Sequence, residues 1–404
     1  MMKAGIQTTE KIPSLPSGWR LVRLDRVCEI IAGQSPPGDT YRNSPVGLPF
    51  FQGKADFGLR HPIARVWCTA PTKIAKPGDI LISVRAPVGP TNVADAECCI
   101  GRGLAAIRPG NDASGDFVLA ALRYKERELV CLANGSTFTA ITREHLASFQ
   151  LPLPPLPEQK RIVAKLSEQM AAIEKARAAA EAQLAAAKAL PAAFLREIFP
   201  KPGSKLPSGW RWMSLENICD DQIGKKDPRL TPLHPFFYVD ISSIDNENKC
   251  VADAKTFLGN KAPSRARQVI RENDVVVSTT RPNLNAVAIV SKRLDGEICS
   301  TGFCVLRPTP SVHPKLLFAY VQSPYFVQTL SELVRGALYP AVTDKHVRAQ
   351  LIPLPPLSDQ KHIVDKINEK LMIAKRVLIT IEEVNGEIGQ IPAALLRKAF
   401  MRNK

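Results

Sequence analysis

The sequence predicts an α+β protein in which two similar globular modules alternate with two long α-helices. The first observation is a duplication: LPSGW at residues 15–19 returns at 206–210, and PLPPL at 152–156 returns at 353–357. The second is a change of composition after each PLPPL, where Gly- and Pro-rich sequence is followed by a long, charged, helix-favouring segment. A repeat near half the chain length indicates a duplicated domain with approximate two-fold symmetry. The predicted parts are a module at 1–155, a helix at 156–200, a module at 201–356 and a helix at 357–404.

Composition indicates a folded, strongly basic protein. The 404 residues can hold more than one core, and a hydrophobic content of 45% argues against disorder. A formal charge of +16 favours a polyanionic partner, nucleic acid first, over an ordinary basic protein. The N-terminus does not resemble a signal peptide, no apolar run is long enough for a membrane span, and the nine cysteines are scattered. We expect a reduced, cytoplasmic protein.

Within each module, short apolar runs bounded by turn formers predict buried strands. DILISV at 79–84 corresponds to DVVVST at 274–279, and LAAIRP at 104–109 corresponds to FCVLRP at 303–308. The stretches between them, such as 61–75 against 251–266, have little in common. The sequence therefore predicts a shared frame with a partly curled sheet and divergent insertions.

Each predicted helix carries apolar residues at alternating four- and three-residue steps, which is the pattern of a coiled-coil seam. The seam positions are Leu166, Met170, Ile173, Ala180 and Leu184 in the first helix and Ile367, Leu371, Ala374, Leu378, Ile381 and Ile388 in the second. Arg177 and Asn385 interrupt it. The first helix is rich in Ala and the second in Ile, Leu and Val, so we expect them to pack together, antiparallel because the halves are two-fold related. The alternative is that each helix packs only on its own module. Pro191 and Pro392 predict a kink or break near each helix end.

These repeated phrases resemble the conserved regions of the specificity (S) subunits of type I restriction–modification enzymes. They are PLPPLPEQK at 152–160, PLPPLSDQK at 353–361, the LPSGW openings, and LDRVC at 24–28 with its counterpart LENIC at 215–219. Asp359 replaces the usual Glu in the second copy. The resemblance covers nearly the whole chain, in order, twice.

The resemblance implies two target recognition domains, each reading one half of a bipartite DNA sequence, with an antiparallel helix pair as spacer. It also implies two methyltransferase (modification) subunits as partners and, optionally, two ATP-driven restriction subunits. The S subunit itself does no chemistry. S-adenosylmethionine, ATP and Mg²⁺ would belong to the partners, and this chain would bind no cofactor or metal.

The sequence lacks the motifs that would indicate catalysis. There is no Asn/Asp-Pro-Pro-Tyr/Phe run, no Walker-type loop and no complete glycine-rich dinucleotide turn. Glu158 and Lys160 match half of a nuclease pattern, but an acidic residue at a helix start is the better interpretation. Two alternatives stay open: a DNA methyltransferase or nuclease with an unrecognised active site, and a coiled-coil scaffold that binds only protein.

Candidate DNA contacts are basic or amide side chains on loops, the groups that reach phosphates and base edges. Arg85 directly follows one predicted strand, and the RPNLN run at 281–285 stands at the equivalent place in the second module. The predicted contacts are Lys54, Arg60, Arg85 and Arg102 in the first module and Lys225, Lys226, Arg281, Asn283, Asn285 and Tyr339 in the second. For any single one of them, a solvated surface charge is the alternative.

Overall fold

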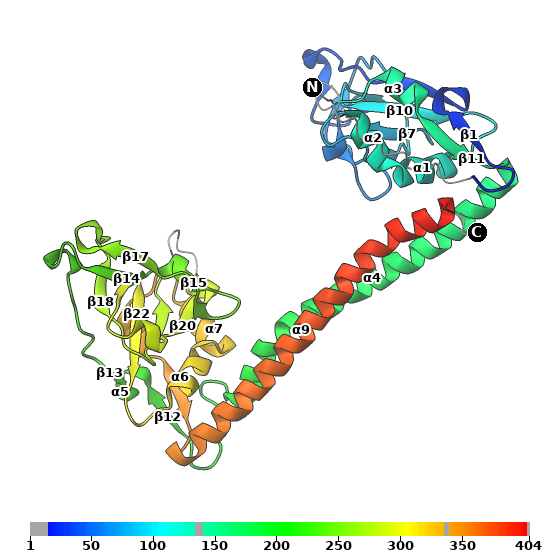
Figure 1. Ribbon diagram of the computed structural model, residues 1–404. Coiled ribbons are helices and arrows are strands. Elements are labelled where there is room, and N and C mark those ends of the chain that lie inside the picture. The colour runs from blue at the N-terminus through cyan, green and yellow to red at the C-terminus, as the bar shows by residue number, and fades with distance from the viewer. Residues whose placement is uncertain (1–14, 134–139, 335–337, 339, 402–404) are drawn as a thin grey trace, which may run out of the picture. The chain divides into compact units, whose positions relative to one another are not determined.

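The computed structural model describes residues 15–133, 140–334, 338 and 340–401 (Figure 1). It divides into two compact units: unit 1 is Met1–Ala180 with Val384–Lys404, and unit 2 is Glu181–Glu383. Each unit therefore holds one globular module together with adjoining parts of both long helices. Among the described residues, no helix combines the length and hydropathy of a membrane span.

The frame of unit 1 is an antiparallel sheet in the order β2-β10-β7-β8. Its strands are β2 Cys28–Ala32, β7 Ile80–Ser83, β8 Thr91–Val93 and β10 Leu104–Pro109. A ribbon of β1 (Arg20–Arg23) and β11 (Gln150–Leu153) lies beside the helices α1 (Gly115–Tyr124), α2 (Glu126–Ala133) and α3 (Arg143–Ser148). Burial of one face of the sheet against these helices forms the main core of the module.

The frame recurs in unit 2 with the same strand order, β13-β22-β19-β20. Its strands are β13 Cys219–Asp220, β19 Val275–Ser278, β20 Val287–Ile289 and β22 Phe303–Pro308. The ribbon is β12 (Arg211–Ser214) with β23 (Leu351–Leu354), and the helices are α5 (Leu215–Ile218), α6 (Pro314–Val321), α7 (Pro324–Glu332) and α8 (Asp344–Arg348). The duplicated runs of the sequence thus form matching strands.

Each module also has a second sheet, where the sequence predicted divergent insertions. In unit 1 its order is β3-β5-β4-β9-β6, and in unit 2 it is β17-β14-β21-β18. The strands are β3 Tyr41–Arg42, β4 Leu48–Phe51, β5 Trp67–Cys68, β6 Ile74–Ala75 and β9 Cys98–Ile100, then β14 Pro235–Val239, β17 Lys255–Leu258, β18 Ala266–Val269 and β21 Ile298–Ser300. In both, the central pair is parallel and the flanking pairs are antiparallel. The insertions differ in sequence but keep one topology. A short hairpin of β15 (Ile244–Asp245) and β16 (Cys250–Val251) is added in unit 2.

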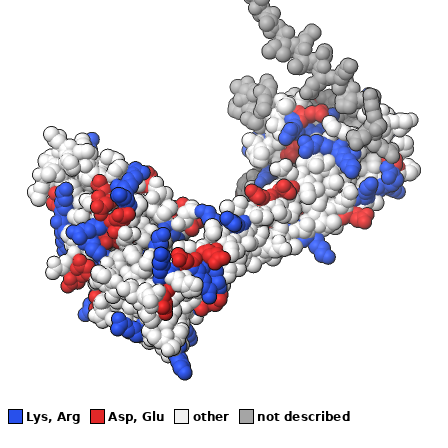
Figure 2. Space-filling model, turned by 60° about the horizontal axis from the view of Figure 1, so that its bottom comes forward, with Lys and Arg blue, Asp and Glu red and all other residues white. Residues whose placement is uncertain are grey.

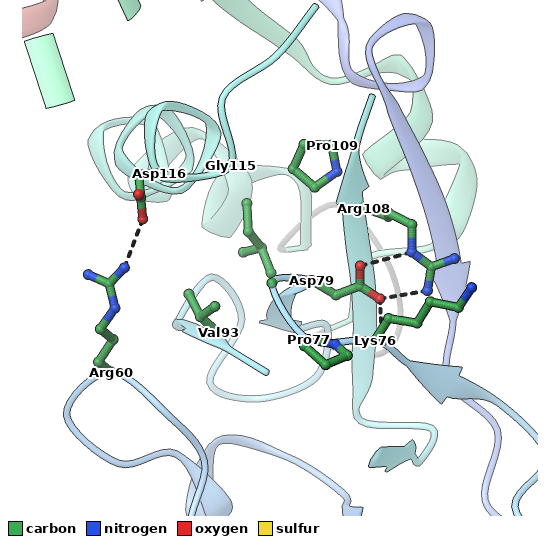
Figure 3. A pocket seen from close by; sticks show the side chains of 11 residues that line it. Arg60, Lys76, Pro77, Asp79, Val93, Arg108, Pro109, Gly115 and Asp116 are labelled. Carbon is green, nitrogen blue, oxygen red and sulfur yellow. Dashed lines mark hydrogen bonds and ion pairs between the residues drawn. The ribbon is translucent and has the colours of Figure 1, made fainter. Parts of the chain in front are cut away.

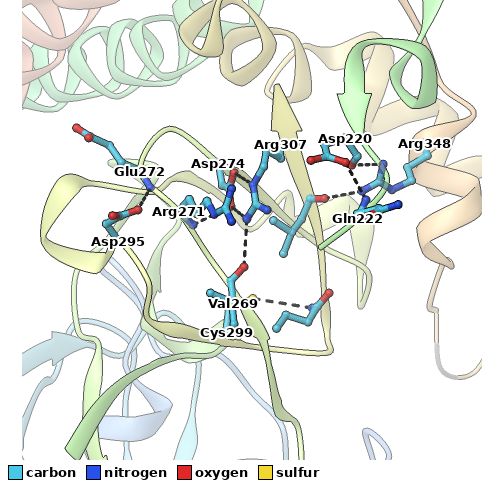
Figure 4. Close-up of polar contacts among 12 residues, drawn as sticks. Asp220, Gln222, Val269, Arg271, Glu272, Asp274, Asp295, Cys299, Arg307 and Arg348 are labelled. Atoms are coloured by element: carbon cyan, nitrogen blue, oxygen red, sulfur yellow. Dashed lines mark hydrogen bonds and ion pairs between the residues drawn. The ribbon is translucent and has the colours of Figure 1, made fainter. Parts of the chain in front are cut away.

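The aspartate that opens the β7 and β19 runs anchors each frame sheet. Asp79 is 2% exposed, and its carboxylate accepts hydrogen bonds from Arg108 Nε at 2.9 Å and Nη2 at 2.7 Å (Figure 3). Asp274 is 1% exposed and pairs with Arg307 in the same way, at 3.0 and 2.8 Å (Figure 4). A buried carboxylate needs such a partner, because leaving it unpaired costs several kcal/mol, about 3–5. These two arginines therefore have structural roles.

The long helices are α4 (Leu156–Ile198) and α9 (Leu357–Phe400), and each has a buried glutamine in its first turn. Gln159 Oε1 accepts from the backbone N–H of Ser114 at 2.7 Å, and its Nε2 donates to the carbonyls of Asp112 and Pro154 at 3.1 and 2.9 Å. Gln360 makes the matching bonds to His313, Ser311 and Pro355 at 2.6, 3.0 and 3.2 Å. The Gln of the repeated PLPPL segment thus ties each long helix to the module that precedes it.

The two helices run antiparallel. In unit 1, Ile162 and Leu166 near the start of α4 share a core with Leu395 and Phe400 near the end of α9. In unit 2, Leu195 and Phe199 at the end of α4 share a core with Val364 and Ile367 near the start of α9. An ion pair at 2.6 Å joins Lys370 to Glu197 in unit 2.

Burial follows the predicted seam. Leu166, Ile173, Ala180, Ile367 and Ala374 are buried, while Met170, Leu184, Leu371, Leu378, Ile381 and Ile388 are half-buried. Of the two interruptions, Arg177 is exposed and Asn385 is half-buried.

The expected helix break at the prolines is wrong, because both helices continue past Pro191 and Pro392. The reason is that the segments after them are held by a module. Leu195 and Phe199 are buried in the core of unit 2, and Phe400 is buried in the core of unit 1. Burial of these large side chains offsets the hydrogen bond that each proline removes.

Candidate nucleic-acid interface

Three of the four predicted contacts of the first module line one hollow of unit 1. Lys54, Arg85 and Arg102 are all exposed, and the hollow has a volume of about 250 Å³. The other lining residues are Ser35, Gln52, Gly53, Ser83, Ala86 and Gly103. The hollow lies where β7 ends, at the loops that follow β4 and β9.

Backbone hydrogen bonds hold these loops side by side. The N–H of Val84 donates to the carbonyl of Gly103 at 2.9 Å, and the hydroxyl of Ser83 donates to the carbonyl of Arg85 at 3.0 Å. On the neighbouring loop, Asp56 accepts from the N–H of Gln52 at 2.7 Å and of Gly53 at 3.3 Å. The hollow is therefore built on fixed main-chain positions.

Gly103 is required where two of these loops meet. A Cβ at this position would lie 2.1 Å from the carbonyl oxygen of Gln52, which is far inside van der Waals contact. Only glycine permits such a close approach of two main chains.

The electrostatics of the hollow are one-sided. No carboxylate lines it, and within the described ranges no ion pair is made by Lys54, Arg85 or Arg102. Converging cations that lack a counter-charge raise the local positive potential and favour an anionic ligand.

Arg60, the fourth predicted contact, lies apart from the other three. Its guanidinium donates to Asp116 at 2.9 Å, and it lines a different hollow of about 500 Å³ near the start of β7 (Figure 3). Its guanidinium therefore already has a carboxylate partner within the module. The structure does not bring Arg60 into the group formed by Lys54, Arg85 and Arg102.

In unit 2 the loop after β19 corresponds closely to the loop after β7. The residue that matches Arg85 differs by one position from the one that the sequence comparison indicated. Ser278 Oγ donates to the carbonyl of Thr280 at 2.9 Å, as Ser83 does to Arg85. The backbone bridges Arg85–Ala140 and Thr280–Ala341 also match. The counterpart of Arg85 is therefore Thr280, and Arg281 stands one residue further along than the sequence comparison placed it.

The predicted residues of this second loop point outward from a tightly wound backbone. Arg281 and Asn283 are exposed, and Arg281 and Asn285 both have left-handed backbones, with φ of 50° and 47°. The carbonyl of Asn285 accepts from Lys249 Nζ at 2.7 Å. Burial lowers the pKa of Lys249, which lies on the β15–β16 hairpin.

Lys225 and Lys226, the remaining described candidates, are exposed and precede the second sheet of unit 2. Lys225 forms a backbone bridge to the buried Gln268 and lies close enough to Asp344 to act on its charge. Burial raises the pKa of Asp344, and Arg348 and Lys225 oppose that shift. Tyr339 lies outside the described residues.

Gln52 and Ser35 line the hollow of unit 1 but were not predicted. Each becomes recognisable only after β4 is paired with β9, because Gln52 follows β4 and Ser35 accepts from the N–H of Arg102 at 3.4 Å. The strands involved are short and carry no signal that fixes this pairing.

Two histidines and the glutamate at the start of α4 have structural surroundings. Among the residues that the structure describes, His, Cys, Asp and Glu do not gather into a group that could hold a metal ion. Glu158 pairs with Arg161, Oε2 to Nε at 2.7 Å, as expected of an acidic residue in the first turn of a helix. His145 and His346 each take part in capping a short helix, through Thr142 and Thr343.

Lys and Arg residues are spread over both modules. On the face shown in Figure 2 they occur on each module and are interspersed with Asp and Glu. On this face, positive side chains are therefore not confined to one module.

The fold, with two matching frame sheets and an antiparallel helix pair, is that of a protein with two copies of one α+β domain. A family model described as the type I restriction modification DNA specificity domain matches residues 16–182 and 207–382. The chain belongs to this family and carries two copies of the domain, as a specificity subunit of a type I restriction–modification system.

Relatives agree with this assignment. A protein of Methanocaldococcus jannaschii, assigned as the type I restriction enzyme MjaX specificity subunit, is 43% identical over 159 residues; the match covers 39% of this chain and 37% of that relative. The EcoDI specificity subunit of Escherichia coli is 21% identical over 314 residues, covering 70% of this chain and 69% of the relative.

Solved structures show the same fold. A chain from a type I restriction–modification system, studied for its complex assembly and conformational transition, superposes with a TM-score of 0.75 at 24% identity and covers 96% of this chain and 98% of its own. The HsdS subunit of Thermoanaerobacter tengcongensis gives a TM-score of 0.65 at 24% identity, with 98% and 100% covered.

Proposed function

We propose that this chain is the non-catalytic DNA-recognition subunit of a type I restriction–modification complex. Each module reads one half of an asymmetric bipartite target, and the helix pair sets the spacer between the half-sites. The observation that carries the proposal is a group of three cations, Lys54, Arg85 and Arg102, around one hollow of a DNA specificity domain. Among the residues that the structure describes, none of the three forms an ion pair. Such a site suits a phosphate backbone and the acceptor-rich edges of bases.

The asymmetry of the target follows from the loops. The two frames match strand for strand, but Arg85 corresponds to Thr280, and the β15–β16 hairpin is present beside the second loop. Different side chains on a common frame read different bases. Two tethered readers also gain affinity through effective concentration.

The helix pair is proposed to dock two methyltransferase subunits. Within unit 2, α9 exposes apolar side chains outside the seam: Met372 is 51%, Ile373 47% and Ile379 46% exposed. Helix faces of this kind serve as partner surfaces.

Chemistry is assigned to the partners. S-adenosylmethionine would bind the methyltransferase subunits, and ATP and Mg²⁺ would bind restriction subunits where these take part. This chain would need no cofactor, and it would act on DNA in the cytoplasm.

Exchange of residues 20–150 for the first module of another specificity subunit tests this function. Coexpressed with its methyltransferase subunits and mapped by methylation sequencing, the exchanged protein should change one half of the methylated motif and keep the other half and the spacer. A motif that changes in both halves, or not at all, would contradict the proposal. Methyl transfer or cleavage by the purified chain alone would instead favour an unrecognised active site.

A further inference from the structure

The hollow of unit 1 that Lys54, Arg85 and Arg102 line presents a pattern of hydrogen-bonding groups that fits one kind of base pair. We infer that it reads a G·C pair in the first half-site, with Arg85 and Arg102 donating to guanine and Gln52 accepting from cytosine. The inference rests on the proposed function and specifies the base class that this hollow recognises.

The hydrogen-bond donors of the hollow are the guanidinium groups of Arg85 and Arg102. In the major groove, guanine offers two neighbouring acceptors, N7 and O6, and arginine is the side chain that most often binds them. Arg85 and Arg102 approach the hollow from two different loops, and neither has an ion-pair partner within the described residues. Both guanidinium groups are therefore free to donate to a ligand.

The acceptor is Gln52. Cytosine offers its N4 amine as a donor beside the guanine acceptors, so a reader of the whole pair needs one acceptor next to its donors. No carboxylate lines the hollow among the described residues. Ser83 is only 2% exposed, and Ser35 already accepts from the N–H of Arg102. The amide oxygen of the exposed Gln52 is therefore the most accessible side-chain acceptor. An A·T pair presents acceptor, donor and acceptor in turn, with a methyl group, and this donor-rich lining fits it less well.

The hollow is suited to reading because it is preformed. Its volume of about 250 Å³ is space that a base edge could enter. The close contact at Gly103 and the Asp56 bonds fix the loops that carry Arg102 and Gln52. A site that is already ordered loses little entropy when it binds.

Unit 2 provides an internal comparison. The N–H of Val84 bonds the carbonyl of Gly103, and the N–H of Thr279 bonds the carbonyl of Gly302, so the two glycines correspond. By this correspondence Thr301 stands where Arg102 does, and Thr280 stands where Arg85 does. Both cations are replaced by short hydroxyl side chains. The guanine-reading arrangement therefore belongs to the first module, and the two half-sites should differ at this position.

The test uses the full chain assembled with its methyltransferase subunits and duplexes carrying the mapped motif. Arg85→Gln and Arg102→Gln should each relax one position of the first half-site, and that position should be G·C in the wild-type motif. Affinity for that duplex should fall roughly 10- to 100-fold, with little change for a duplex carrying A·T there. Arg127→Gln, an exposed arginine on α2, is the matched control and should leave both affinities unchanged.

Replacing the guanine by 7-deazaguanine removes N7 while leaving base pairing intact. It should weaken wild-type binding and have little further effect on the arginine variant whose contact it removes. Gln52→Ala removes the acceptor for the cytosine N4 amine and should weaken the preference for G·C at that position.

The outcomes distinguish a failure of the inference from a failure of the proposed function. Duplex binding and a methylated motif that persist with unchanged specificity in both arginine variants would overturn the inference and leave the proposed function standing. Equal loss of affinity for G·C and A·T duplexes would also overturn it, since it would mark a phosphate contact. If the wild-type complex binds no duplex and directs no methylation, the proposed function itself fails.

Discussion

At the scale of single residues, the partner of an arginine decides what it does. Arg108 and Arg307 bind buried aspartates and hold the frame sheets together, and Arg60 is engaged by Asp116. Arg85 and Arg102 have the same chemistry but line a hollow without a carboxylate. A sequence shows all five as basic residues near strands. Only the fold separates the arginines that bind carboxylates from those that form no ion pair among the described residues.

The buried glutamines provide a prediction at this scale. Gln159→Leu would leave the Ser114 N–H and the carbonyls of Asp112 and Pro154 without their partner, and each buried unsatisfied group costs about 1–3 kcal/mol. We expect a loss of about 3 kcal/mol in the free energy of unfolding, measured by urea denaturation. Gln360→Leu should cost a similar amount, whereas Gln183→Leu, at an exposed position on α4, should cost little. Equal effects of Gln159→Leu and Gln183→Leu would show that Gln159 does not hold α4 to the first module.

The role of these glutamines was missed by the sequence interpretation for a definite reason. The repeated acidic-Gln-Lys pattern drew attention to Glu158 as a helix-start residue, and its ion pair with Arg161 agrees with that interpretation. Gln159 reaches backbone groups more than forty residues away in sequence, with which no local pattern connects it. Of the candidate DNA contacts, the sequence supplied Lys54, Arg85 and Arg102 but could not show that they meet.

At the scale of elements, periodicity predicted what is local and left out what is paired at long range. The strands β7, β10, β19 and β22 and the two long helices follow from apolar runs and a 4-3 repeat, and they lie where expected. The other frame strands were not predicted. The second sheet of each module could not be predicted from periodicity. Strands such as β5 and β6 are only two residues long and are recognisable only through the strands they pair with. The prolines misled in the opposite direction, since local helix breaking was overcome by burial of Phe199 and Phe400.

The small residues of α4 provide a prediction at this scale. Ala187 is buried in unit 2, where a larger side chain would have to displace its neighbours. Ala187→Leu should lower the free energy of unfolding by about 1–3 kcal/mol. Ala185→Leu, an exposed site two residues away, is the control and should change stability by less than about 0.5 kcal/mol. Tolerance of Ala187→Leu at the level of Ala185→Leu would argue against close helix packing.

At the scale of the whole molecule, each module is completed by a helix end from the other half of the sequence. Phe199, which ends the first half, packs on Tyr320 in unit 2, and Phe400, which ends the second, packs on Trp19, Phe117 and Tyr124 in unit 1. This exchange follows from the duplication and from the antiparallel helices. Each module is thus joined to the helix pair covalently and by packing, as the proposed spacer role requires.

The most direct test of this account is the length of the spacer. Inserting one heptad into each of α4 and α9 keeps the seam in register and lengthens the pair by about 10 Å, which is about three base pairs of B-DNA. Methylation sequencing of a host that carries the extended chain and its methyltransferase subunits should recover the same two half-sites with a spacer about three base pairs longer. Recovery of both half-sites with the original spacer would show that the helix pair does not set the distance.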